Sequence, residues 1–220
     1  MVTKRQLEIE NMNTTLVMKR WSRFIRTRKI TNIPTTNRFT ARLKLSKRFK
    51  GIDAEGFTPQ TLRGYSAMMS VFLAFSAFEG LINSIEENEY LPSTKLTVEF
   101  TVNKHSHEFS DVKLENELRK NTKLLEMLFE YVEVDANRGN TKRIERLILF
   151  YMGKSDLNVI ASSIRNVVAH GQLTVSGGKV MTKRNADVLF QLARVIEKET
   201  TTQFGKYVEL LEKKYPKVTN

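Results

Sequence analysis

The pattern of apolar residues along the chain predicts a protein built mainly from helices. From residue 62 to 85 nearly every face of a helix would be apolar, which is typical of a helix at the centre of a fold. Thr58 and Pro59 precede it as an N-cap and a first-turn proline. The longest charge-free stretch, residues 64–78, is shorter than the roughly 20 residues that span a bilayer, so we expect a core helix.

Further elements follow from the spacing of apolar residues. Residues 95–102 alternate between apolar and polar and predict one short strand. Residues 31–60 contain prolines, glycines and a Thr/Asn-rich opening, which favour a linker, and residues 176–179 are typical of a turn. Apolar residues at helical spacing predict additional helices over residues 3–30, 114–132, 141–152, 155–170 and 183–214.

These elements predict a mainly α fold. We expect an up-and-down helical bundle with a short strand or hairpin insertion and a basic N-terminal extension. The division into parts would place a basic arm and linker at residues 1–58 and a helical domain at residues 59–216.

Positive charge is concentrated at the N-terminal end of the chain. Residues 1–50 contain 14 Lys and Arg against two acidic residues, so this segment accounts for the whole net charge of +12. Such asymmetry indicates an anionic partner, and we expect RNA, with Trp21 and Phe24 stacking on bases. The alternatives are a solvated helix face, or an arm that docks on an acidic protein or a membrane surface. The residues expected to bind RNA are Lys19, Arg20, Arg23, Arg26, Arg28 and Lys29.

The absence of cysteine excludes several kinds of site: disulfides, zinc-thiolate centres, iron-sulfur clusters and thiol nucleophiles. The N-terminal residues form no apolar run, so we expect a cytoplasmic protein that does not associate with a membrane. We expect no metal and no cofactor. His105 and His107 have the spacing of two ligands on a strand, but without a third ligand nearby a solvated loop end is the favoured interpretation.

One short segment, residues 163–171, carries the candidate chemistry. Its sequence is Ser-Ile-Arg-Asn-Val-Val-Ala-His-Gly, in which Arg165, Asn166 and His170 are the strongly polar side chains of an apolar run. On a helix Asn166 and His170 lie one turn apart, whereas Arg165 is about 140° round from His170. A two-fold dimer would repeat the helix and bring arginine and histidine of both chains into one cleft.

The Arg-Asn-x-x-x-His-Gly sequence resembles the signature of the HEPN superfamily, in which four to six residues separate an arginine from a histidine near a helix end. The segment 77–83, Ala-Phe-Glu-Gly-Leu-Ile-Asn, resembles an early helix of that family, and the similarity covers about residues 60 to 214. The resemblance implies a HEPN-type bundle and a homodimer. For catalytic members it implies RNA cleavage without a metal, by attack of the 2′-hydroxyl on the adjacent phosphate, which leaves a cyclic phosphate end.

The resemblance also implies roles for particular residues. His170 would move a proton to or from an oxygen, and Arg165 would stabilise the charge that grows on the phosphate. Asn166 would donate to a phosphate oxygen or orient His170. Glu79 is a further candidate, although a buried carboxylate more often pairs with an arginine for structural reasons.

We therefore expect a metal-independent endoribonuclease that cleaves single-stranded RNA, of the kind found in toxin-antitoxin and antiviral systems, where a neutralising protein partner is common. The alternative is a noncatalytic HEPN module that binds nucleic acid, nucleotide or a protein, in which Arg165 and His170 only form a polar cluster at a helix end. A DNA-binding regulator is a third hypothesis, but no helix-turn-helix pattern supports it.

Overall fold

The helical prediction is confirmed, and the regular structure of the described residues is entirely α-helical. The computed structural model describes residues 4–30, 34–90, 100, 102, 107–136, 142–154, 157–170 and 181–216. The helices are α1 (Lys4–Thr27), α2 (Pro34–Arg48), α3 (Pro59–Tyr90), α4 (Val112–Arg119), α5 (Thr122–Ala136), α6 (Lys142–Tyr151), α7 (Leu157–Ala169) and α8 (Lys183–Lys214).

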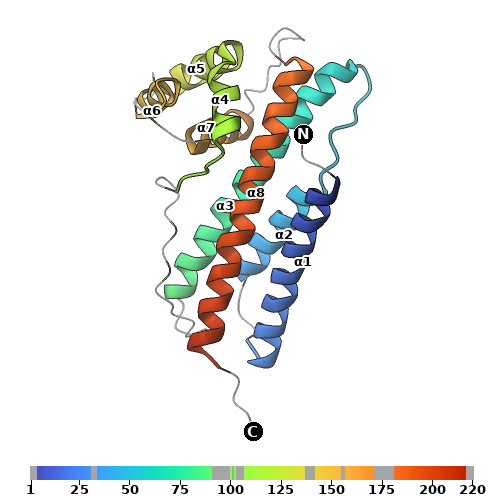
Figure 1. The fold of residues 1–220 in the computed structure, drawn as a ribbon, viewed down its shortest axis with the longest axis vertical. Coiled ribbons are helices and arrows are strands. Elements are labelled where there is room, and N and C mark those ends of the chain that lie inside the picture. Colours follow the sequence, from blue (N-terminus) through green and yellow to red (C-terminus); the bar gives the residue numbers. More distant parts are fainter. Residues whose placement is uncertain are drawn as a thin grey trace.

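Two long helices, α3 and α8, form the centre of the fold (Figure 1). Helix α2 packs on α3 and α8, and helix α1 lies along α8, so these four helices make a bundle. The shorter helices α4 to α7 form a group beside the bundle, in which α7 contacts α3 and α4 contacts α8 (Figure 1).

The two central helices run in the same direction. At their N-terminal ends the Gln60 amide donates to the Met181 carbonyl oxygen at 3.1 Å, and one turn further on Arg63 forms an ion pair with Asp187. A parallel pair needs a long connection, which here contains α4 to α7. The helical bundle is thus confirmed. The up-and-down arrangement predicted for it is wrong for α3 and α8, because these two neighbouring helices are parallel.

The prediction of a linker over residues 31–60 is wrong for residues 34–48, which form α2. Pro34 is the first helical residue, where its missing N–H costs no hydrogen bond. Two apolar side chains one turn apart, Phe39 and Leu43, are fully buried and fix α2 against the central pair. Proline therefore marks the start of a helix here, and not a loop.

The N-terminal segment is a packed part of the bundle and not a free arm. The indole of Trp21 stacks on the Phe24 ring at 5.7 Å, and both side chains belong to the buried core together with Phe204. Phe39 of α2 also contacts Phe204, with 4.8 Å between the ring centroids. The boundary expected at residue 58 stays a prediction, although α1 and α2 share their core with the later helices.

Two other expectations differ from the structure or lie outside it. The single helix expected over residues 114–132 is divided into α4 and α5, because the Asn121 side chain accepts a hydrogen bond from Leu124 N at 3.3 Å and caps a new helix. The predicted strand lies outside the described residues except for Phe100 and Val102, which are not in a strand. The turn at residues 176–179 also lies outside them.

Helix α3 is the central element that the apolar run predicted. By length and composition alone, its residues Pro59–Glu86 could cross a membrane. This is weak evidence for a membrane span, because 67% of the most apolar 18-residue stretch of the helix is buried inside the protein. Burial of this kind is what the prediction of a core helix requires.

Candidate functional site

The first candidate site lies on α7, which packs on α3. The helix buries one apolar face, including Ile160, Ile164 and Val167, and ends at Ala169. Beyond it, His170 N still donates to Asn166 O at 2.9 Å, so the last turn of the helix positions the histidine. The sequence therefore places Arg165 and Asn166 within the helix and His170 at its C-terminal end.

Arg165 is held by two oxygen atoms. Its Nε donates to Oε2 of Glu79 on α3 at 3.0 Å, and its Nη1 donates to Oδ1 of Asn166 at 3.1 Å. The Glu79 side chain is 11% exposed and the Arg165 side chain 33%, so the pair sits at the edge of the core. The ion pair neutralises the buried carboxylate, and it fixes the plane of the guanidinium group.

His170 differs from Arg165 in its surroundings. It is exposed, and its imidazole forms no hydrogen bond or ion pair with the other described residues. The structure thus brings Arg165, Asn166 and Glu79 together and leaves His170 open to solvent. Within one chain Arg165 and His170 are separated by about 7.5 Å along the helix axis and by about 140° around it.

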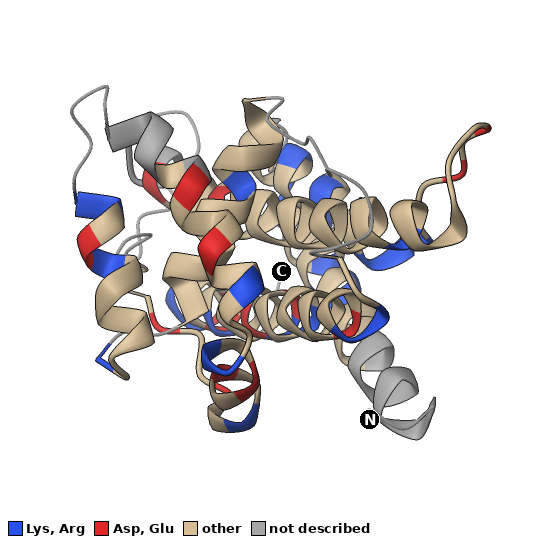
Figure 2. Ribbon diagram, turned by 90° about the horizontal axis from the view of Figure 1, so that it is seen from above, with Lys and Arg blue, Asp and Glu red and all other residues tan. Residues whose placement is uncertain are grey.

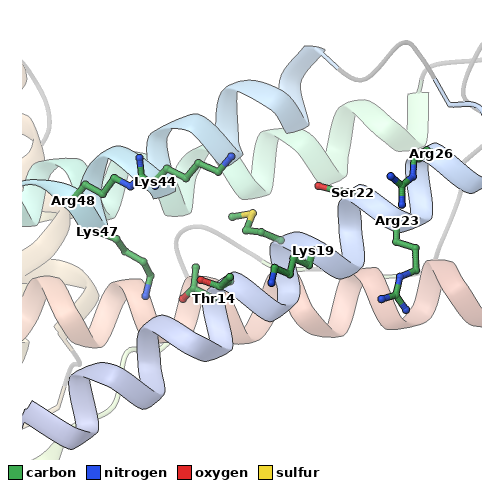
Figure 3. Close-up of a pocket in the computed structure, with 10 residues that line it drawn as sticks. Thr14, Lys19, Ser22, Arg23, Arg26, Lys44, Lys47 and Arg48 are labelled. Carbon is green, nitrogen blue, oxygen red and sulfur yellow. The ribbon is translucent and has the colours of Figure 1, made fainter.

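The second candidate site is a groove between α1 and α2, with a volume of about 860 Å³. Basic residues line it from both helices, and Figure 3 shows Lys47 of α2 extending toward Thr14 of α1. The described residues of its lining include no acidic side chain. We call this site the basic groove, and its full lining is Thr14, Thr15, Met18, Lys19, Ser22, Arg23, Arg26, Lys44, Lys47 and Arg48.

The six residues that the sequence assigned to RNA binding are divided by the structure. Lys19, Arg23 and Arg26 line the basic groove, and Lys29 is exposed after the end of α1. The other two join α1 to α8: Arg20 Nε donates to Glu212 at 2.6 Å, and Arg28 Nε donates to the Tyr215 carbonyl oxygen at 2.6 Å. Their hydrogen bonds hold the helices together.

The expected stacking of Trp21 and Phe24 on bases is contradicted by the structure. Both side chains are buried, with 3% and 0% of the residue surface exposed. They lie on the face of α1 that packs toward α8, while Arg28 covers the Phe24 ring at 4.2 Å. An aromatic residue among cations in a sequence can therefore be the core-facing side of an amphipathic helix.

Lys44, Lys47 and Arg48 of α2 were missed as site residues. Their positive charge was included in the count for residues 1–50. However, a linker was predicted over residues 31–60, and without a helix there was no reason to expect their side chains to lie on one surface. Their spacing of three and four residues is the signal that could have found them, because on a helix it groups the three side chains.

His107 is not the solvated loop residue that its sequence position favoured, and His105 lies outside the described residues. The His107 ring packs on Phe78 and Phe109, at 5.0 and 5.3 Å between ring centroids. Its Nε2 lies 3.2 Å from Oε1 of Glu199, at ion-pair distance but without the alignment of a hydrogen bond. This contact with His107 lowers the pKa of Glu199 below its ordinary value of 4.5, and Gln203 adds to the effect while burial opposes it.

Among the described residues no three His, Cys, Asp or Glu side chains are grouped as metal ligands. The chain matches no protein-family model, no curated protein and no solved structure.

Proposed function

We propose that this protein is a HEPN-type endoribonuclease that cleaves single-stranded RNA without a metal ion and acts as a homodimer. The observation that carries the proposal is the polar end of α7, where a solvent-exposed histidine follows an arginine whose guanidinium group is fixed in place. Exposure leaves the His170 imidazole accessible to a substrate. Fixation of Arg165 reduces the entropy cost of binding a phosphate.

The Arg165 guanidinium group has a free edge for this task. Nε and Nη1 are used by Glu79 and Asn166, whereas Nη2 makes no hydrogen bond to the described residues. An N–H donor in a fixed plane can stabilise a phosphate oxygen whose negative charge increases in the transition state. Asn166 then acts by orienting Arg165, which differs from the roles that the resemblance implied for it.

The cleavage step uses histidine as both base and acid. A neutral imidazole takes the proton of the RNA 2′-hydroxyl while this oxygen forms a bond to the adjacent phosphorus. The bond from phosphorus to the 5′ oxygen breaks, and that oxygen receives a proton from the imidazolium of the second subunit. The products are a 2′,3′-cyclic phosphate and a free 5′-hydroxyl.

A dimer is part of the proposal because one chain separates the two side chains. Arg165 and His170 point to different sides of α7, and a second α7 related by a two-fold axis supplies the missing partner for each. A cytoplasmic location and a neutralising protein partner would accompany a nuclease of this kind.

The experiment compares the wild-type protein with His170→Ala on mixed-sequence single-stranded RNA in the presence of EDTA. We expect fragments with cyclic phosphate ends from the wild type, and a rate reduced by about 10²- to 10⁴-fold in the variant. Asn83→Ala, an exposed polar residue of α3, is the control and should cleave normally. Equal cleavage by wild type and His170→Ala would refute the assignment.

One observation favours a noncatalytic binding module as the second candidate. Arg165 already has Glu79 as a counter-ion, so the pair could be purely structural. For such a module, wild type and His170→Ala would both bind RNA and neither would cleave it.

A further inference from the structure

The basic groove has a charge that the rest of the chain does not balance. No acidic residue occurs from residue 11 to 50, whereas the rest of the chain contains basic and acidic residues in equal number, and both kinds are scattered over its helices (Figure 2). Two carboxylates of α8 are already used in contacts with α1 and α2, since Glu212 accepts from Arg20 and Glu197 accepts from Ser46. Among the described residues no ion pair is found for Lys19, Arg23, Arg26, Lys44 or Arg48.

The cations form rows rather than a single cluster. On α1 the spacing of Lys19, Arg23 and Arg26 places them on one face, along about 10 Å of the helix axis. On α2 Lys44 and Arg48 are one turn apart and line the other side of the groove (Figure 3). The two rows lie toward different ends of the groove (Figure 3), and charge that is spread along its length matches a chain of phosphates better than one small anion.

The remaining lining of the basic groove indicates what is recognised. Among the described lining residues Met18 is the only apolar side chain, and the exposed Ser22 supplies a hydroxyl group. The aromatic residues of α1 are buried in the core, so bases find no stacking surface among the lining residues. A lipid surface is less suitable, because membrane binding by a helix requires an apolar face that enters the acyl region.

We infer that the basic groove binds the phosphate backbone of an RNA strand without reading its sequence. Phosphate contacts position a strand and carry no direct sequence information. The groove is formed by α1 and α2, whereas the polar end of α7 belongs to another group of helices, so strand binding does not depend on whether α7 cleaves RNA.

The test measures binding with an RNA that cannot be cleaved. The probe is a fluorescent 2′-O-methyl RNA of mixed sequence, which lacks the 2′-hydroxyl nucleophile, so a failure of catalysis cannot affect the result. The groove variant combines Lys19→Gln, Arg23→Gln, Lys44→Gln and Arg48→Gln. The control combines Lys113→Gln, Lys123→Gln, Lys142→Gln and Lys154→Gln, which remove the same charge from exposed positions on α4 to α6 and just after α6.

We expect the groove variant to bind at least about tenfold more weakly than the control in fluorescence anisotropy at low salt. The slope of log K against log salt should decrease by about 0.7 for each phosphate that the groove no longer binds. A DNA strand of the same length should bind about as well as the RNA, because phosphates are common to both. Circular dichroism should show both variants folded, since all eight side chains are exposed.

Three results would overturn the inference. Equal affinities of groove variant and control would show that only net charge matters. Strong preference for one homopolymer over another would show base recognition. Groove-dependent binding to vesicles of phosphatidylserine and phosphatidylcholine, with no groove-dependent binding to the RNA probe, would assign the surface to membranes.

Discussion

Glu79 is a single residue with two roles, one in the core and one in the proposed site. Its carboxylate is nearly buried on α3, and its Oε2 atom accepts a hydrogen bond from Arg165 of α7. Burial of a carboxylate is unfavourable unless it is paired, so the arginine is required for the stability of this part of the core. The same hydrogen bond orients the guanidinium group for the proposed reaction.

We expect Glu79→Gln to lower the free energy of unfolding by about 1 to 3 kcal/mol, because the amide keeps the shape but leaves a partly buried guanidinium group without a counter-ion. Urea denaturation followed by circular dichroism measures this. Glu86→Gln, an exposed carboxylate on the same helix, is the control and should stay within about 0.5 kcal/mol of wild type. A Glu79→Gln protein as stable as the control would show that the ion pair contributes no net stability.

At this scale the sequence could identify polar residues but not most of their partners. Arg165, Asn166 and His170 were found because they interrupt an apolar run. Glu79 was found in the same way, and the structural alternative weighed for it, a pair with an arginine, is what occurs. That the arginine is residue 165 could not be read from the sequence, since the two are 86 positions apart and meet only when α7 packs on α3.

Among the elements, α2 has the greatest effect on the interpretation of the molecule. Its apolar pattern is short, and its first residues are typical of a loop, so local sequence gives a weak helical signal. The helix is stabilised by tertiary packing, with Phe39 and Leu43 inserted into the core. Long helices such as α3 and α8 were predictable because many turns repeat their pattern, whereas only two apolar side chains are buried among the residues of α2 whose burial is described.

Two leucines of α2 test this explanation. Leu43 is fully buried, whereas Leu45 is 55% exposed, so the same substitution removes core packing at one position and little at the other. We expect Leu43→Ala to lower the free energy of unfolding by about 2 to 5 kcal/mol and Leu45→Ala to change it by less than about 0.5 kcal/mol. Chemical denaturation of both variants measures the difference. Similar effects at the two positions would contradict the placement of α2.

For the whole molecule, the parallel arrangement of α3 and α8 has a steric requirement at its start. A Cβ atom on Gly64 would lie 2.8 Å from the Met181 Cβ and 2.9 Å from its Cγ, so the chain entering α8 passes directly over this glycine. At Gly80 of the same helix a Cβ would meet Phe39 Cα and Arg42 Nη1 at 3.5 Å, which is an ordinary contact. The direction of the chain at this point is therefore linked to one small residue.

Alanine at these two glycines should have opposite effects. We expect Gly64→Ala to destabilise the fold by about 1 to 3 kcal/mol through overpacking against Met181. Gly80→Ala should be neutral or stabilise by up to about 1 kcal/mol, because alanine favours the helical state more than glycine does. Thermal and urea unfolding distinguish the two. Gly64→Ala with unchanged stability would indicate that the start of α8 can move away from α3.

The position of α8 in the chain also has a consequence for biosynthesis. This helix packs on α1, α2, α3 and α4, yet 92 residues lie between the end of α3 and its first residue. A ribosome that adds about 5 to 20 residues per second needs roughly 5 to 18 s to make them. Throughout that interval the apolar surface of α3 has no α8 to cover it, so the nascent chain exposes a surface to which holding chaperones bind.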